Sequence, residues 1–416
     1  MALEPAIILP FHRAAGSFIL GDPRMSIVRA STGQGINRLG RSFTVPPNTL
    51  RPRFHPLTGV CEGIHVERTA TNLLLQSQAF NTTWTATSLT VAADSTIAPD
   101  GTTTADTLTA TGAGGNVAQA ITIAVGRGIS ISAHGKPLAS SFLWVQVTDG
   151  SNAVECWFNL SAGTTGANTA GTATCVFSQK AIEPHALGFW RCMLDVNTAT
   201  STSFTVKFGP AAADGVQPAN GNSIIVWGAQ GEAEMAVSAA TSYIPTTTAA
   251  VTRSAENLHL PIDAAWFNPS EGTLVYEFVN RTVPIGLPGS HVAGGVANSF
   301  NDVIYLSRTG TSTMQALFAA GGVTSAMLTR TWSFTPGAIV KCAVAWAQND
   351  MAFVVDGGTA ATSAASFTPP TFARIGLGCA PWSTNDNGNK PSATLRAFKY
   401  IPRRAPTVDM QALTAA

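Results

Sequence analysis

Charged residues are scarce in this chain: Asp, Glu, Lys and Arg make up only 11% of its 416 residues, against roughly 25% in an ordinary globular protein. The formal net charge of +1 creates no field that would draw the whole molecule to nucleic acid or anionic lipid. We therefore expect no nucleic-acid partner. We also expect no membrane insertion, because no window approaches the roughly 18 uninterrupted apolar residues of a spanning helix.

Cysteines are few, and none stands in a CxxC pair or at zinc-ligand spacing. Buried free thiols are therefore expected at the six positions, which are Cys61, Cys156, Cys175, Cys192, Cys342 and Cys379.

The first residues lack a basic region that leads into a continuous apolar stretch, because prolines and charged residues interrupt them. No secretory route is expected from such a start.

Motifs that carry catalysis are also missing from the sequence. There is no Gly-x-Ser-x-Gly nucleophile elbow, no HExxH zinc motif and no close histidine pair among the seven histidines. The turn Gly33-Gln-Gly-Ile-Asn37 lacks the Lys-Ser/Thr and following helix of a phosphate loop. We therefore expect no enzyme activity and no cofactor.

Thr, Ser, Ala, Gly and Asn take the place of the missing charges, a mixture that suits β-strands joined by tight turns. From 69 to 253, apolar and small polar residues alternate between frequent turns, as in Ser141-Phe-Leu-Trp-Val-Gln-Val-Thr148. This alternation predicts an antiparallel β-sandwich. Tryptophans at the apolar strand positions are expected to fill cores: Trp84, Trp144, Trp157, Trp190, Trp227, Trp266 and Trp346.

Two stretches at the ends of this segment carry a resemblance to a known family. The first is Thr71-Asn-Leu-Leu-Leu-Gln-Ser-Gln78. The second combines Trp227-Gly-Ala-Gln230 with Thr241-Ser-Tyr-Ile-Pro-Thr246. Together they resemble the carbohydrate-binding-module-like jelly roll of tailed-bacteriophage (or gene-transfer-agent-like) virion structural and adhesion proteins. Gly188-Phe-Trp-Arg-Cys192 resembles a further element of the same family.

The segment 254–416 resembles a concanavalin-A-like (laminin-G-like) sandwich. The resemblance rests on an opening Glu-Gly-Thr273 strand, a strand that ends in Val355-Asp-Gly-Gly358, and a closing Leu395-Arg-Ala-Phe-Lys-Tyr-Ile-Pro-Arg403 strand. A last helical turn is expected at Val408–Leu413. The fold class is thus all-β, with two antiparallel sandwiches, at 69–253 and 254–416, preceded by an extended N-terminal arm at 1–68.

The N-terminal segment is locally basic, with eight arginines against four acidic residues in 1–70. We interpret it as an attachment arm that docks on another virion protein, and a nucleic-acid contact is the alternative. The arginines assigned to attachment are Arg13, Arg24, Arg29, Arg38 and Arg41.

The best candidate for a sugar site is the loop that begins Trp382-Ser-Thr-Asn-Asp-Asn-Gly-Asn389. Sugars bind flat aromatic faces flanked by amides and carboxylates, which are supplied here by Trp382, Asn385, Asp386, Asn387 and Asn389. The same composition also suits any exposed turn. Calcium is an alternative ligand, although the Asp-x-Asp-x-Asp spacing is absent. Trp190 and Arg191 form a second candidate, because an outward-facing Arg beside an aromatic residue bonds sugar hydroxyls.

The resemblance implies a virion protein, in a head spike or fibre or a tail fibre, that is assembled in the host cytoplasm and adheres to host surface polysaccharide. Other virion proteins and a host cell-surface glycan are the expected partners, and a homo-oligomer is expected, with a trimer favoured. A purely structural capsid-decoration or tail-assembly role without sugar binding is the alternative. A polysaccharide depolymerase needs two carboxylates, and Glu277 lacks a second acid at i+2 or i+4 on its strand.

Overall fold

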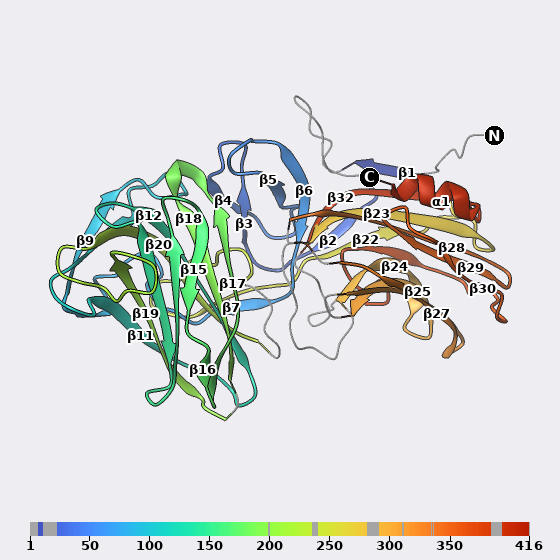
Figure 1. The fold of residues 1–416 in the computed structure, drawn as a ribbon. Helices are drawn as coiled ribbons and strands as arrows, with labels where there is room; N and C mark the ends of the chain where they lie inside the picture. Colours follow the sequence, from blue (N-terminus) through green and yellow to red (C-terminus); the bar gives the residue numbers. More distant parts are fainter. Residues whose placement is uncertain are drawn as a thin grey trace.

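The computed structural model describes residues 7–10, 23–198, 200–234, 240–280, 291–309, 312–333, 335, 337–383 and 393–415. Strands dominate these residues, which form four large sheets and one two-stranded pair. The sheets pack as two β-sandwiches that lie side by side (Figure 1). The all-β class and the antiparallel sandwiches predicted from the sequence are confirmed.

The first sandwich is built from residues between 85 and 234. One sheet has the order β16 (Gly171–Thr172), β17 (Cys175–Pro184), β18 (Trp190–Thr198), β12 (Gly128–Pro137), β20 (Ser223–Glu234), β10 (Ala105–Ala110) and β9 (Leu89–Thr96). The other has the order β15 (Thr164–Asn168), β14 (Ala153–Asn159), β13 (Phe142–Thr148), β19 (Ser203–Ala211), β11 (Asn116–Thr122) and β8 (Thr85–Thr87). Alternate residues of both sheets, such as Leu143, Val145 and Val147 of β13, fill the core between them.

The second sandwich joins the two ends of the chain. Its larger sheet runs β30 (Ala361–Ser363), β29 (Asp350–Val355), β28 (Ile339–Ala347), β23 (Gly272–Asn280), β32 (Ala393–Ile401), β6 (Cys61–Val66), β5 (Pro52–Phe54), β3 (Gly33–Ile36) and β4 (Ser42–Val45), and β1 (Ile7–Pro10) also pairs with β32. Its smaller sheet runs β2 (Ser26–Val28), β22 (Asn257–Pro261), β31 (Arg374–Leu377), β24 (His291–Ser299), β25 (Asp302–Thr309), β26 (Thr313–Ala320) and β27 (Val323–Thr331).

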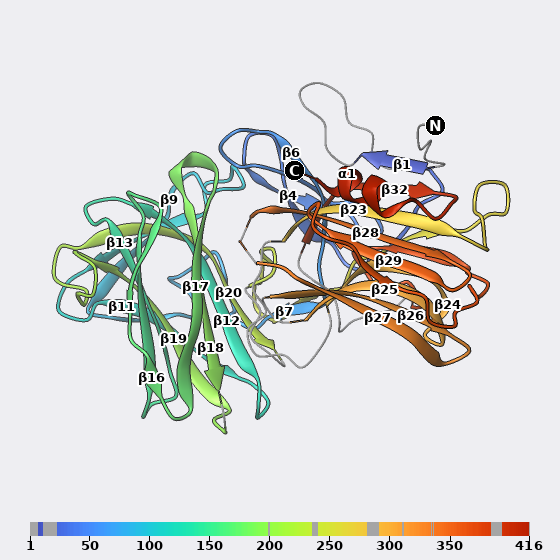
Figure 2. The ribbon, with the colours of Figure 1, turned by 45° about the vertical axis from the view of Figure 1, so that its right-hand side comes forward.

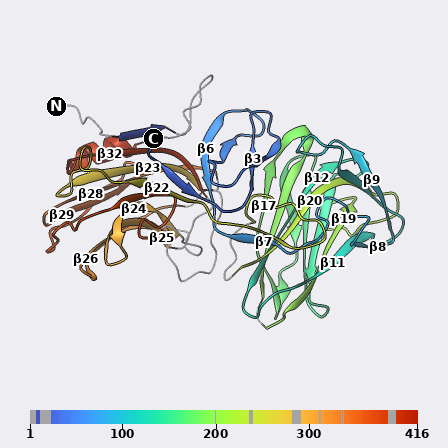
Figure 3. The same cartoon turned by 180° about the vertical axis from the view of Figure 1, so that it is seen from behind.

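The N-terminal segment is therefore not a separate arm over the residues that the structure describes. Strands β2 to β6 extend both sheets of the second sandwich, and Figures 2 and 3 show these blue strands beside the orange and red ones. Ile64 and Val66 of β6 belong to the same apolar core as Leu274 and Leu395. Gly63 permits the close contact of β6 with β32, because a Cβ atom there would lie 2.1 Å from the carbonyl oxygen of Leu395.

A two-stranded pair connects the sandwiches. Strand β7 (Ala70–Asn72) runs antiparallel to β21 (Val251–Arg253), with Asn72 opposite Val251 and Ala70 opposite Arg253. The chain thus enters and leaves the first sandwich at the same place, so that the first sandwich is an insertion within the second. The sandwich borders placed at 69 and 253 from the sequence lie beside this pair.

The single α-helix of the described residues, α1 (Thr407–Thr414), covers the outer face of the larger sheet of the second sandwich. Met410 packs there against Val275, Ala343 and Val354. The helical turn predicted at Val408–Leu413 is confirmed. This helix is too short to cross a membrane, and no other described segment forms a membrane-spanning helix.

Candidate functional site

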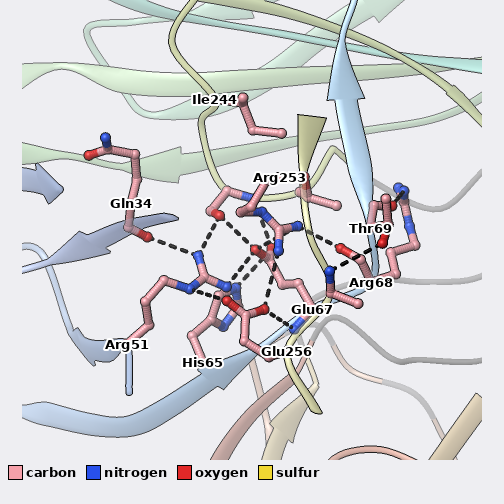
Figure 4. Close-up of polar contacts among 12 residues, drawn as sticks. Gln34, Arg51, His65, Glu67, Arg68, Thr69, Ile244, Arg253 and Glu256 are labelled. Atoms are coloured by element: carbon pink, nitrogen blue, oxygen red, sulfur yellow. Dashed lines mark hydrogen bonds and ion pairs between the residues drawn. The ribbon is translucent and has the colours of Figure 1, made fainter. Parts of the chain in front are cut away.

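A cluster of buried ionic side chains lies where the two sandwiches meet (Figure 4). The carboxylate of Glu256 pairs with Arg29 at 3.0 Å, Arg51 at 2.8 Å and Arg253 at 3.2 Å. The carboxylate of Glu67 pairs with Arg51 at 2.8 Å and Arg253 at 3.3 Å. All five side chains are at most 1% exposed. Such a cluster is stable only because each charge faces opposite charges at close range.

The pKa values of both carboxyl groups in the cluster are lowered. Burial alone would raise the pKa of Glu67, but His65, Arg253 and Arg51 together hold it well below its usual range. Burial opposes the shift at Glu256 as well, and the arginines Arg51 and Arg253 lower its pKa. Burial lowers the pKa of His65, so its neutral ring donates from Nε2 to Glu67 at 2.9 Å. Both glutamates are therefore ionised at neutral pH and hold structure rather than transfer protons.

The same cluster reaches into the first sandwich. The backbone N–H and Oγ–H of Ser242 donate to Glu67 at 2.8 and 2.6 Å, and Arg51 donates to the Ser242 hydroxyl at 2.5 Å. Nearby, Arg68 pairs with Glu232 at 3.0 Å. Charged and polar bonds thus join the inserted sandwich to the strands that flank it.

The stretch that carries the family resemblance forms this junction. Trp227 is buried against His134 and Tyr243, with ring centroids 5.1 and 4.7 Å apart. The side chain of Gln230 accepts a hydrogen bond from the backbone N–H of Ile244 at 2.6 Å. These motif residues therefore contact one another inside the protein.

The arginines expected on an attachment arm fall into different environments. Arg29 is fully buried in the ionic cluster and is therefore absent from any exposed basic surface. Arg24 and Arg38 lie over the rings of Trp266 and Phe54, at 5.6 and 5.7 Å from the ring centroids. Arg41 is half-buried beside the turn at Gly101. Arg13 lies outside the described residues.

The expectation that Arg191 faces outward to bond sugar hydroxyls is wrong. Its guanidinium is buried and donates to the Ser132 hydroxyl at 2.9 Å and to the carbonyl of Thr241 at 2.6 Å. Trp190 is half-buried and packs against the core of the first sandwich, beside Gly163. The two residues alternate across β18, so they do not form one platform.

Five of the other tryptophans expected in cores are buried: Trp84, Trp144, Trp157, Trp227 and Trp346. Trp266 is half-buried.

Trp382 belongs to an aromatic group on the outer face of the second sandwich. Its ring centroid lies 5.3 Å from that of Phe300 and 5.1 Å from that of Tyr305, both in edge-on geometry. Beneath it, Val303 and Ala319 form a small apolar cluster on the face of β25 and β26 that points away from the core. Phe300 is 63% exposed. We call Phe300, Trp382 and Tyr305 the aromatic patch.

The patch is flanked by polar groups. Asn301 is exposed next to Phe300, and the carboxylate of Asp302 accepts a hydrogen bond from the backbone of Gly321 at 2.8 Å. The remaining residues of the predicted sugar loop, Asn385, Asp386, Asn387 and Asn389, lie outside the described residues. Sequence reasoning missed Phe300 and Tyr305. The signal was present in β25, where Val303 and Tyr305 alternate with Ile304 and Leu306, so that both of its faces are apolar.

The acid tested for catalysis is held in a salt bridge. Glu277 accepts from Nε of Arg396 at 2.7 Å, and the two side chains are 20% and 17% exposed. Within the described part of the chain, no three His, Cys, Asp or Glu side chains are grouped as a metal site requires.

All six cysteines are buried free thiols, as predicted. Burial raises the pKa of the Cys192 thiol well above its usual range, which makes it unreactive.

No family model matches the chain, and no curated protein matches it. Among solved structures it is similar to the CBM40 of the Ruminococcus gnavus IT-sialidase bound to α2,3-sialyllactose (10% identity, 36% of this chain, 84% of that chain, TM-score 0.29). It is also similar to the NanB sialidase of Streptococcus pneumoniae (8% identity, 36% and 24% covered, TM-score 0.29) and to a SAP-like pentraxin of Limulus polyphemus (8% identity, 35% and 70% covered, TM-score 0.27). At these TM-scores the likeness carries no functional assignment, and the all-β class is shown by the chain's own sheets.

Proposed function

We propose that the protein is a non-catalytic adhesion protein of a tailed-bacteriophage or related particle, and that it binds host surface glycan through the aromatic patch. The patch is the observation that carries the proposal. Phe300 presents its ring to solvent, and Trp382 stands edge-on to it. Aromatic faces of this kind stack on the C–H surface of sugar rings, while neighbouring amides such as Asn301 bond to their hydroxyls.

Support for a particle protein comes from the Trp227-Gly-Ala-Gln230 and Thr241–Thr246 stretches, which resemble those of phage virion proteins. Ser242 of the second stretch donates two hydrogen bonds to Glu67 of the ionic cluster, and these bonds help to join the two sandwiches. Such a join keeps the patch in a fixed orientation relative to the rest of the chain. We place the protein in the virion, in contact with other virion proteins, as a homo-oligomer, and we place its assembly in the host cytoplasm.

One patch alone gives weak binding. An aromatic contact contributes roughly 0.5–1.5 kcal/mol, which corresponds to about two- to twelvefold in affinity for each ring. Several copies on one particle raise the overall avidity by about 10²–10⁴ when their geometry permits simultaneous contacts. Adhesion therefore depends on the oligomer and on the number of copies in the particle.

The experiment compares the purified wild-type oligomer with a Phe300→Ala/Trp382→Ala double variant on glycan arrays and on host cells. The proposal predicts saturable wild-type binding that falls at least tenfold in the double variant. Val408→Ala is the matched control, because Val408 is 66% exposed on α1, which covers the other sheet of the second sandwich. The thermal midpoint of each variant is measured, since Trp382 also contacts Tyr305.

Two other results would replace the proposal. Blank arrays together with blank cell binding by the wild type would favour the purely structural role. Release of reducing ends from host polysaccharide, lost in Glu277→Gln, would show a depolymerase.

A further inference from the structure

The two sandwiches meet through polar contacts and share no buried apolar core in the described part of the chain. Each apolar cluster there consists either of residues within the inserted segment 72–251 or of residues outside it. Hydrogen bonds cross the junction instead. The backbone N–H of Ala186 donates to the carbonyl of Gly40 at 3.2 Å, and that of Ser42 donates to the carbonyl of Pro99 at 3.1 Å. Domains joined without a large apolar interface move relative to each other, so opening of the junction would leave both cores intact.

Two histidines of the first sandwich lie at this junction. His134 of β12 and His185, which follows β17, line a cavity of about 30 Å³ whose opposite wall is formed by β3, β4, β5 and β6. Their rings are in edge-on contact, with centroids 4.9 Å apart. The two residues are only 1% and 5% exposed. Because the strands of the second sandwich close the cavity, separation of the sandwiches would bring both rings into contact with water.

The hydrogen bonds of His185 require a neutral ring. Its Nδ1 accepts the backbone N–H of Ala186 at 2.9 Å, and its Nε2 lies 3.2 Å from the hydroxyl of Ser42 on β4. A proton added at Nδ1 would point at the N–H of Ala186, so protonation would break this bond. The same N–H also donates across the junction to Gly40, and the two contacts would be disturbed together.

The surroundings of both rings also disfavour protonation. Burial lowers the pKa of His185 to about 3. Arg53 and Arg191 lower this pKa further, and Glu183 opposes them. Burial lowers the pKa of His134 well below its ordinary value, and His185 and Arg191 act in the same direction. Both rings are therefore neutral at pH 7 while the junction is closed.

The charges at the junction already have a small positive balance. Its ion pairs, together with Arg191, contain six arginines and five glutamates, a formal balance of +1. Glu183 stands opposite Arg191 in the β17–β18 register and pairs with Arg53 at 3.3 Å. On the facing wall, the neutral ring of His65 donates to Glu67 at 2.9 Å. The arginines are Arg29, Arg51, Arg53, Arg68, Arg191 and Arg253, and the glutamates are Glu62, Glu67, Glu183, Glu232 and Glu256. Protons on the two rings would add positive charge where it is already in excess, and like charges at close range repel.

From these contacts we infer that the junction is an acid-sensitive switch, in which protonation of His134 and His185 separates the two sandwiches while each of them stays folded. The inference is independent of the proposed adhesion function, because no residue of the aromatic patch takes part. In the separated state both rings face water and have the ordinary histidine pKa of 6.5. The open state therefore takes up protons below about pH 6.5, whereas the closed state does not. Each histidine shifts the equilibrium about tenfold toward the open state for each pH unit below that value.

Other buried acids do not produce this effect in the same pH range. The contributions of Glu67 and Glu256 are lost only below about pH 4.5, since their pKa values are lowered in the folded protein from 4.5. Burial raises the pKa of Asp195 to about 6, so acid favours its folded environment and opposes opening. Opening between pH 6.5 and pH 4.5 would therefore be due to the histidines.

Hydrogen exchange of the full-length protein between pH 7 and pH 4.5, measured by mass spectrometry and corrected for its intrinsic pH dependence, tests the inference. Peptides that contain the amides of Ser42 and Ala186, whose bonds cross the junction, should lose protection on the order of hundredfold between pH 7 and pH 5. The amides of β13, which pair within the first sandwich, should keep their protection. The radius of gyration from small-angle scattering should rise over the same range and recover at pH 7, with an unchanged far-UV circular dichroism spectrum.

The double variant His134→Gln/His185→Gln should keep the junction amides protected down to about pH 4.5, where the glutamates begin to titrate. His55→Gln is the matched control, because His55 lies in the turn between β5 and β6 and does not line the cavity. It should follow the wild-type profile. If the double variant does not fold by circular dichroism, His185→Gln alone replaces it and should reduce the dependence from about hundredfold to about tenfold for each pH unit.

Three results would overturn the inference. The first is constant protection of the junction amides in the wild type from pH 7 to pH 5. The second is loss of the far-UV spectrum together with that protection, which would mean unfolding instead of separation. The third is a wild-type pH profile in the folded histidine variants.

Discussion

Arg29 donates a hydrogen bond of 3.0 Å to Glu256, a residue 227 positions later in the chain. The whole inserted sandwich lies between the two residues in sequence, yet their side chains are 0% and 1% exposed. This pair joins the strand ends before the insertion to those after it. It explains why the N-terminal segment belongs to the second sandwich and does not project as an arm.

Glu256→Gln should destabilise the protein strongly. Three arginines would then face one remaining carboxylate, that of Glu67, in a buried site. Breaking a buried ion pair from one side costs about 3–5 kcal/mol. Urea denaturation followed by circular dichroism should show this loss in the free energy of unfolding.

Glu277→Gln provides the comparison, because its pair with Arg396 is partly exposed. A pair of that kind contributes about 1 kcal/mol or less. Equal losses in the two variants would mean that the buried cluster does not join the sandwiches as described.

Stability should decrease in acid. The pKa values of Glu67 and Glu256 are lowered in the folded protein from an ordinary value of 4.5. Their contribution is therefore complete above about pH 4.5 and is lost as the pH falls below it, because the unfolded chain takes up protons first. Urea midpoints measured from pH 7 to pH 3 should fall over this range, and the fall should be shallower in Glu256→Gln. A wild-type midpoint that stays constant down to pH 3 would exclude the linkage.

Asp195 should lower the stability of the protein as the pH rises, in contrast to Glu67 and Glu256, whose contribution is lost in acid. Burial raises its pKa to about 6, and its Oδ2 accepts a hydrogen bond from Gln179. The ionised form is therefore disfavoured in the folded protein, and this cost develops as the pH rises through 6. Asp195→Asn should stabilise the protein at pH 8 by roughly 1–3 kcal/mol and have little effect at pH 4. Thermal midpoints at both pH values measure the difference, and an equal effect at both would contradict it.

Local patterns were sufficient to predict the strands. Alternation in Ser141–Thr148 indicated the strand that is β13, and the helical turn predicted at Val408–Leu413 lies within α1. The pairing of β6 with β32 could not be predicted from the sequence, because the partners are separated by more than 300 residues and no local pattern specifies such a contact. The short strands β2 to β6 were consequently interpreted as an arm.

Local patterns also failed to predict which side chains lie beside the candidate site residues. Trp382 was predicted from its loop composition, but its partner Phe300 comes from a different turn that the topology brings beside it. Arg191 follows an aromatic residue in the sequence, and the alternation of β18 then decides that its side chain points inward. Whether a strand residue faces solvent or a second domain depends on how the sandwiches pack, which the sequence pattern does not contain.

The most direct test of the claim that the first sandwich is an insertion removes that sandwich and joins Asn72 to Val251 through an Asn-Gly turn. These residues lie opposite each other in the β7–β21 pair, so a two-residue hairpin turn closes the chain without the first sandwich. The shortened protein should unfold cooperatively and bind host cells through the aromatic patch as the wild type does. A chain that begins at residue 254 should not fold, since it lacks β2 to β6. Failure of the hairpin chain to fold or to bind, or independent folding of 254–416, would contradict the account.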